Sequence, residues 1–131
     1  MVEVLIDTNF IVTCMKQKIQ MIEQFGNLFG HYDLIVPRQV LEELEKLKAS
    51  EKLKVKDRES ASVAVALINA NNIKPTELAT KDVDAGIIRY SKENPEVYIA
   101  TLDRALKQKI KEKNRSAKFI TIRKKTRIVI Q

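Results

Sequence analysis

Short apolar runs alternate with longer amphipathic stretches along this chain, as expected when strands alternate with helices. The runs are rich in valine and isoleucine and predict buried strands at residues 2–6, 33–36, 97–101, 119–122 and 128–130. Between them, apolar residues recur every three or four positions and predict helices at 9–16, 19–28, 38–48, 57–70, 82–92 and 105–113. We therefore expect a single α/β domain over residues 1–131, a three-layer α/β/α sandwich with a mostly parallel sheet.

The helical period also predicts which side chains face the core. The second predicted helix, which we expect to end at Gly26 or Gly30, presents Ile19, Ile22, Phe25 and Leu28. In the helix at 57–70 the predicted inward residues are Val63, Ala66, Leu67 and Ala70. In the helix at 105–113 they are Leu106 and Ile110.

Composition excludes several classes of protein. Hydrophobic residues make up 44% of the 131 residues and charged residues 31%, which is typical neither of disordered chains nor of membrane proteins. The single cysteine, Cys14, lies among apolar residues and fits a reducing compartment, so we expect a cytoplasmic protein with no membrane partner. The single histidine, His31, follows Gly30, is interpreted as a loop residue and gives no basis for a histidine-rich zinc site.

Positive charge is concentrated at the C-terminal end of the chain. Of the 24 Lys and Arg residues, 11 lie in residues 104–131, together with only one of the 17 acidic residues. This segment therefore has a net charge of +10, whereas residues 1–103 have a net charge of −3. A basic end on a mildly acidic body favours a polyanionic partner such as RNA, although lysine-rich surfaces are common without one.

Two acids directly follow predicted buried strands. Asp7, with Thr8 and Asn9, follows the first strand, and Asp103 follows the strand at 97–101. In open α/β sheets, ligands bind at the carboxyl ends of the strands. Asp7 is equally suited to a turn or to the N-cap of the next helix, and the first strand alone does not separate these interpretations.

Other acids lie on predicted helices. On the helix at 38–48, Glu42 is predicted to face solvent, while Glu43 and Glu45 border the apolar stripe on opposite sides, so helical geometry does not choose between them. Asp84 lies three and four residues before two isoleucines and therefore shares their inward face. A helix N-terminus also favours a carboxylate at Asp84, so dipole complementarity is the structural alternative there.

Four carboxylates brought together would repel one another unless a cation joined them. Mg²⁺ and Mn²⁺ prefer oxygen ligands, and such ions polarise phosphoryl oxygens and activate water. No constellation of His, Cys or Ser competes with this interpretation. Acidic residues on the body and a basic end suit a metal-dependent enzyme that acts on a phosphate backbone.

Four short segments of the chain resemble the successive motifs of PIN-domain ribonucleases. They are Ile6-Asp7-Thr8-Asn9-Phe10, residues 40–47, residues 84–88, and Ile99-Ala100-Thr101-Leu102-Asp103-Arg104. The chain is most similar to the branch that contains ribosomal-RNA-processing PIN proteins and their archaeal relatives. The resemblance implies an endoribonuclease that uses Mg²⁺ or Mn²⁺, with rRNA processing or RNA quality control as its role.

The resemblance also implies the roles of individual residues. The family's acidic positions, which bind metal and carry catalysis, fall on Asp7, Glu43, Asp84 and Asp103, which selects Glu43 over Glu45. Supporting positions fall on Thr8, Asn9 and Thr101. Arg104 is interpreted from its place beside Asp103 and not from the resemblance: it is the cation nearest the acids, and it either contacts the scissile phosphate or pairs with a carboxylate. Where that branch often carries a further acid this chain has Ala105, which puts the number of metal ions in question.

Surface cations supply the predicted RNA contacts. Aromatic residues are only 5% of the chain, so backbone electrostatics and not base stacking should dominate RNA affinity. The candidate contacts are Lys107, Lys111, Lys124, Lys125 and Arg127.

Three other functions compete with RNA processing. A toxin ribonuclease would share the fold and chemistry and would bind an antitoxin-like protein; a homodimer is the other candidate assembly. A PIN-fold scaffold could bind RNA without cleaving it, but all four acids are present. A phosphoacceptor domain would need paired acids after the first strand, where this chain has Thr8 and Asn9 after Asp7.

Overall fold

Five strands form one sheet in the computed structural model, which describes residues 1–131, with the strand order β2-β1-β3-β4-β5. The strands are β1 (Val2–Ile6), β2 (Tyr32–Ile35), β3 (Tyr98–Ala100), β4 (Lys118–Arg123) and β5 (Arg127–Ile130). Strands β2, β1, β3 and β4 are parallel, and only the β4–β5 hairpin is antiparallel. The predicted mostly parallel sheet is confirmed.

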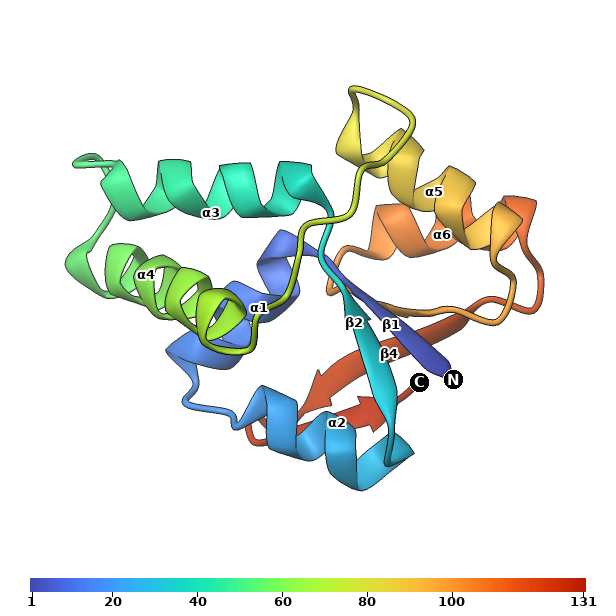
Figure 1. Cartoon of the computed structure of the whole chain (residues 1–131), viewed down its shortest axis with the longest axis horizontal. Helices are drawn as coiled ribbons and strands as arrows, with labels where there is room; N and C mark the ends of the chain where they lie inside the picture. Colours follow the sequence, from blue (N-terminus) through green and yellow to red (C-terminus); the bar gives the residue numbers. More distant parts are fainter.

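Six helices cover the two faces of this sheet. They are α1 (Thr8–Lys16), α2 (Met21–Phe29), α3 (Arg38–Ala49), α4 (Val55–Ala70), α5 (Val83–Glu93) and α6 (Arg104–Lys113). Figure 1 shows α3 and α4 on one side of β1 and β2, and α5 and α6 on the other. The structure therefore has the predicted three-layer α/β/α architecture.

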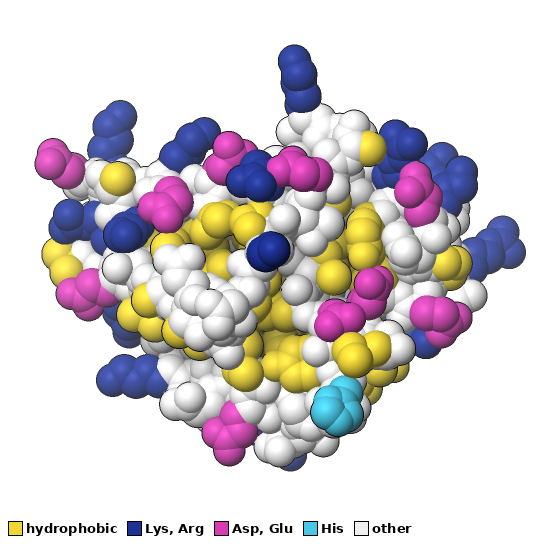
Figure 2. Space-filling view, in the orientation of Figure 1, with side chains coloured by type: hydrophobic (Ala, Val, Ile, Leu, Met, Phe, Trp, Pro, Cys, Tyr) yellow, Lys and Arg dark blue, Asp and Glu magenta, His cyan; other side chains and the backbone are white.

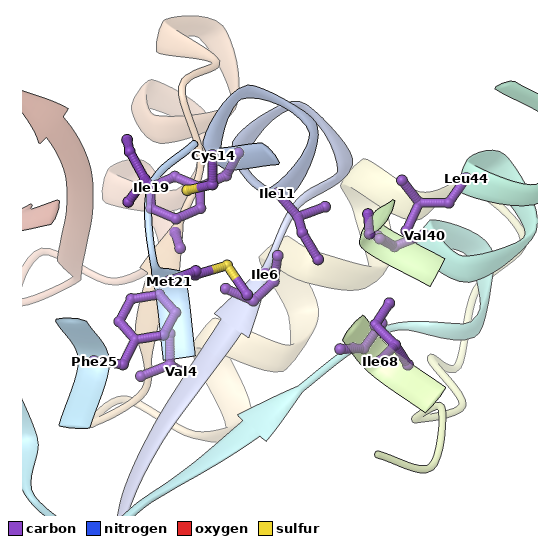
Figure 3. Close-up of a cluster of buried hydrophobic side chains, with 14 of the residues drawn as sticks. Val4, Ile6, Ile11, Cys14, Ile19, Met21, Phe25, Val40, Leu44 and Ile68 are labelled. Atoms are coloured by element: carbon purple, nitrogen blue, oxygen red, sulfur yellow. The ribbon is translucent and has the colours of Figure 1, made fainter. Parts of the chain in front are cut away.

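Alternate residues of the strands bury two separate apolar cores. Val4 and Ile6 face one way and pack with buried residues of α1, α2, α3 and α4 (Figure 3). Leu5 and Ile99 face the other way and pack with buried residues of α5 and α6. Both faces of β1 are thus covered, which explains why its sequence is an almost continuous apolar run.

The predicted inward face of α4 is wrong for three of its four residues, and only Leu67 packs against the core. Val63 is 52% exposed, and Ala66 and Ala70 also face solvent, whereas Ala61 and Ala64 are fully buried. Residues 60–68 carry small or branched apolar side chains on almost every side, so the helical period fits several faces. Packing against α1 and α3 decides between those faces, and it buries the small side chains where the helices approach closely.

The second helix is also shorter than its apolar pattern. Ile19 is buried but precedes α2, and Leu28 is 39% exposed. The helix ends at Gly30, the second of the two predicted stops, where φ is +70° and glycine has no steric cost. Cys14 is buried and His31 is an exposed loop residue, as predicted.

Charged side chains lie around the edge of the face drawn in Figure 2. Figure 2 shows Lys and Arg side chains around the rim of one face, several of them over α5 and α6. None of the six helices has the length and apolar character needed to cross a membrane.

Candidate active site

Asp7 and Asp103 lie at the ends of neighbouring parallel strands. Ile6 pairs with Ala100, and the backbone N–H of Asp7 donates to the carbonyl oxygen of Ala100 at 3.0 Å. The chain segments that follow β1 and β3 therefore leave the sheet side by side. Both sets of residues lie at the carboxyl edge, where ligands bind in open α/β sheets.

Both aspartates are helix N-caps. The Oδ1 atom of Asp7 accepts a hydrogen bond from the Thr8 N–H at 2.9 Å, at the start of α1. The Oδ1 atom of Asp103 accepts one from the Leu106 N–H at 3.1 Å, at the start of α6. The capping interpretation of Asp7 is correct, and it does not exclude a ligand role, since each capping oxygen has a second lone pair.

Thr101 links the two strand-end acids. Its side chain is fully buried, and its hydroxyl donates to Oδ2 of Asp7 at 2.7 Å. The same hydroxyl oxygen accepts a hydrogen bond from the backbone N–H of Asp103 at 3.1 Å. Asn9 adds a further connection, since its Oδ1 accepts from the Leu102 N–H at 3.1 Å. These bonds fix the loop after β3 against the start of α1.

Glu43 joins this group from α3. The hydroxyl of Thr8 donates to Oε2 of Glu43 at 3.3 Å, so the glutamate reaches the loop after β1. Glu45 makes no hydrogen bond to this loop and is exposed. A single contact from another element therefore distinguishes two glutamates that helical geometry left equivalent.

The fourth acid, Asp84, lies in the first turn of α5 and is half-buried, while Asp82 caps that helix through a hydrogen bond from the Ala85 N–H at 3.1 Å. Burial raises the pKa of Asp84 above its ordinary value, and the charges of Asp103 and Asp82 raise it further. Lys109 lowers the pKa of Asp84 and is the one cation that offsets these effects.

The charges of two of the other acids act on the carboxyl group of Asp7. Its side chain is only 8% exposed, and this burial is the main reason why its pKa is raised. The hydrogen bonds from Thr101 and Thr8 lower the pKa of Asp7, whereas the charges of Asp84 and Glu43 raise it. The four predicted acids, which come from four different parts of the chain, therefore act on one another electrostatically.

The donors are all oxygen atoms, which suits Mg²⁺ or Mn²⁺ better than zinc. No three Asp, Glu, His or Cys side chains are arranged so that they could hold one metal ion in this structure. The acids therefore form an electrostatic group and not a closed chelate. Binding of a divalent cation would relieve the mutual repulsion that raises the pKa values of Asp7 and Asp84.

The cations of α6 are divided between two sides of the helix. Lys107 and Lys109 are separated by about 160° around the helix axis, on opposite borders of its buried stripe. Lys109, which sequence analysis did not select, is the one that acts on Asp84. Arg104 lines a hollow with Lys107 and Lys111 on the other side of α6 and forms no ion pair with a carboxylate. The sequence does hold a signal for Lys109, which is its helical position at the border of the stripe formed by Leu106 and Ile110.

The remaining predicted RNA contacts lie in the β4–β5 turn. Lys124 and Lys125 both have positive φ, as the central residues of a type I′ turn do, and the Thr126 N–H closes the turn onto the Arg123 carbonyl at 3.2 Å. Ala100 pairs with Ile120, and β4 continues to Arg123, so the turn lies about 10 Å further in the strand direction than the end of β3. Lys124, Lys125 and the neighbouring Arg127 are all exposed.

Comparison with known proteins agrees with this architecture. A family described as a PIN like domain matches residues 4–125 of the chain. Ribonuclease VapC4 from Methanocaldococcus jannaschii is 34% identical over 115 residues, which cover 87% of this chain and 86% of that protein. The solved structure of the PIN domain endonuclease Utp24 has the same fold, with a TM-score of 0.77 at 23% identity over 98% of this chain and 90% of that one. The chain therefore belongs to the PIN-like domain family.

Proposed function

We propose that the protein is a metal-dependent endoribonuclease that hydrolyses phosphodiester bonds in RNA. The observation that carries this proposal is the electrostatic group formed by Asp7, Glu43, Asp84 and Asp103 at the carboxyl edge of the sheet. Similarity to a ribonuclease over most of the chain supports it. We expect water to attack phosphorus in line with the 3′-oxygen, which leaves and takes up a proton, so that the products carry 5′-phosphate and 3′-hydroxyl ends.

The four carboxylates are the proposed ligands of Mg²⁺ or Mn²⁺. When bound, such an ion lowers the pKa of water and offsets negative charge on the phosphoryl and leaving oxygens. Asp7 and Asp103 are fixed by N-cap bonds, so they supply the rigid part of the site. Glu43 is exposed and Asp84 half-buried, so these two have more freedom to adjust to a cation.

The neutral polar residues orient the acids. Thr101 holds the second oxygen of Asp7 in place and keeps the pKa of that carboxyl lower than burial alone would set it. Thr8 connects the loop after β1 to Glu43, and Asn9 secures the loop after β3. Lys109 is the cation best placed to meet a phosphate beside Asp84.

The two glutamates of α3 provide a matched test. Glu43→Gln removes one charge from the acid group, and Glu45→Gln removes one charge from an equally exposed class of position two residues away on the same helix. With purified protein, Mn²⁺ and a single-stranded RNA, we expect Glu43→Gln to lose most of its cleavage rate and Glu45→Gln to retain it. Equal rates for the two variants would contradict the proposed role of Glu43.

For the biological role, we favour rRNA processing or RNA quality control in the cytoplasm, on the strength of the motif resemblance. The alternative from the same resemblance is a toxin ribonuclease with an antitoxin-like protein partner. Controlled expression separates these roles: a toxin arrests growth unless its partner is supplied, whereas a processing enzyme does not. A PIN-fold scaffold differs from both of these enzymes, because it would bind RNA without cleaving it.

A further inference from the structure

A basic hollow of about 450 Å³ lies between α6 and the end of the sheet, on the side of α6 away from Asp84. Its lining includes Arg104, Lys107 and Lys111 from α6, together with Thr121 of β4 and Gln131. Leu102 forms another part of the wall and directly precedes the candidate ligand Asp103. The loop after β3 therefore contributes neighbouring residues to the hollow and to the candidate active site.

The three cations of this hollow have no anionic partner. None of them forms an ion pair, and no acidic residue lines the hollow. Lys107 donates a hydrogen bond to Oε1 of Gln131 at 2.7 Å, which holds its ammonium group over the hollow. Burial, together with the charges of Lys111 and Arg104, lowers the pKa of Lys107. An anion in the hollow would relieve this repulsion.

Phe119 orients the two lysines. Its ring is almost fully buried, and the Nζ atoms of Lys107 and Lys111 lie 6.0 and 5.6 Å from the ring centroid. Both distances are within the range in which an ammonium group is attracted to an aromatic face. The two lysines are thus directed over one side chain, unlike lysines that extend freely into solvent.

We propose that this hollow binds a phosphate group of the RNA substrate. The proposal rests on the proposed ribonuclease function and adds to it a defined place for a second phosphate beside the one to be cleaved. Three cations, an amide and a hydroxyl suit the several acceptor oxygens of a phosphate. The group is either an internal phosphodiester or a 5′-terminal monophosphate, which share this chemistry.

The test compares Lys107→Gln, Lys111→Gln and the double variant with a control pair. The control is the double variant Lys92→Gln with Lys113→Gln, which removes the same amount of charge. These two lysines belong to α5 and α6 and line a different hollow. Affinity is measured by fluorescence anisotropy with 3′-labelled single-stranded RNA in Ca²⁺, over a range of salt concentrations. Each RNA is prepared with a 5′-hydroxyl and with a 5′-phosphate.

We expect each single variant to bind RNA about tenfold more weakly, since each loses a charged hydrogen bond. Because both lysines contact one phosphate, the double variant should lose less than the product of the two effects, and its log–log salt slope should flatten by about 0.7. Loss confined to 5′-phosphorylated RNA would assign the hollow to the RNA end, and equal loss for both RNAs to an internal phosphate.

Two results would overturn the proposal. One is a double variant that binds no more weakly than the control pair. The other is multiplicative losses with a slope change of about 1.4, which would mean two separate phosphate contacts. Binding is measured without cleavage, so a protein that binds RNA through this hollow but cuts nothing would refute the ribonuclease and leave this inference standing.

Discussion

Removal of the Thr101 hydroxyl should destabilise the protein by about 2–3 kcal/mol at pH 7 in the absence of metal. In Thr101→Val the buried hydroxyl is lost with little change in volume, so Asp7 loses a 2.7 Å hydrogen bond and the Asp103 N–H loses its acceptor at 3.1 Å. A hydrogen bond to a charged group such as Asp7 contributes about 1.5–3 kcal/mol to stability, and a neutral hydrogen bond such as that from the Asp103 N–H contributes about 1 kcal/mol. The methyl group that valine adds is buried, and this burial offsets part of the combined loss.

The pH dependence identifies the bond to Asp7 as the main contribution. Thr101 lowers the pKa of Asp7, so it stabilises the ionised carboxyl more than the protonated one. Burial raises the folded-state pKa of Asp7 above its unfolded value, so on acidification the carboxyl takes up its proton at a higher pH in the folded protein than in the unfolded chain. The cost of Thr101→Val should therefore fall toward about 1 kcal/mol as the pH is lowered from 7 to 4, as measured by urea denaturation at both pH values.

Thr101→Ser is the control, since it keeps the hydroxyl and removes only a buried methyl group. It should cost about 1 kcal/mol at both pH values. If Thr101→Val costs the same at pH 4 and pH 7, or if Thr101→Ser shows the same pH dependence, then Thr101 does not hold the ionised Asp7 as described.

Two further experiments test the acids and the basic turn. Millimolar Mn²⁺ should raise the melting temperature. Asp84→Asn should raise the metal-free melting temperature at pH 7 and blunt the response to Mn²⁺. Because the folded pKa of Asp84 is raised, this gain should shrink as the pH is lowered through that pKa. A wild-type melt that ignores Mn²⁺ would contradict the assembly of acids. The double variant Lys124→Asn with Lys125→Gly suits a type I′ turn better than the two lysines do, so it should stabilise the protein. It should also weaken RNA binding to a similar degree for all RNA sequences, because it removes two phosphate-binding charges. An unchanged RNA affinity and salt slope would show that the turn is only solvated surface.

The strand–helix alternation and the strand-end positions of Asp7 and Asp103 could be predicted from sequence because they depend on local pattern. Strand residues buried on both faces read as apolar runs, and the residue after such a strand must lie at the edge of the sheet. Leu106 and Ile110 of α6 were assigned correctly because polar residues surround them and leave one apolar phase.

Features that depend on contacts between elements could not be predicted in this way. The face of α4 is set by its approach to α1 and α3, since its own sequence permits several phases. Glu43 differs from Glu45 through its contact with Thr8, which is 35 residues away in the chain, and through its charge effect on Asp7. The electrostatic effect of Lys109 on Asp84 depends on the packing of α6 beside α5, which brings the two side chains near each other.

The measurement that tests the central claim most directly is RNA cleavage by purified wild-type and Asp7→Asn protein in Mn²⁺. The charges of both Glu43 and Asp84 act on Asp7, and the amide keeps an oxygen that can accept the Thr8 N–H. The account predicts that Asp7→Asn slows cleavage by about a hundredfold or more, with circular dichroism and unfolding still cooperative. Cleavage by Asp7→Asn at the wild-type rate would contradict the assignment of this acid group as the active site.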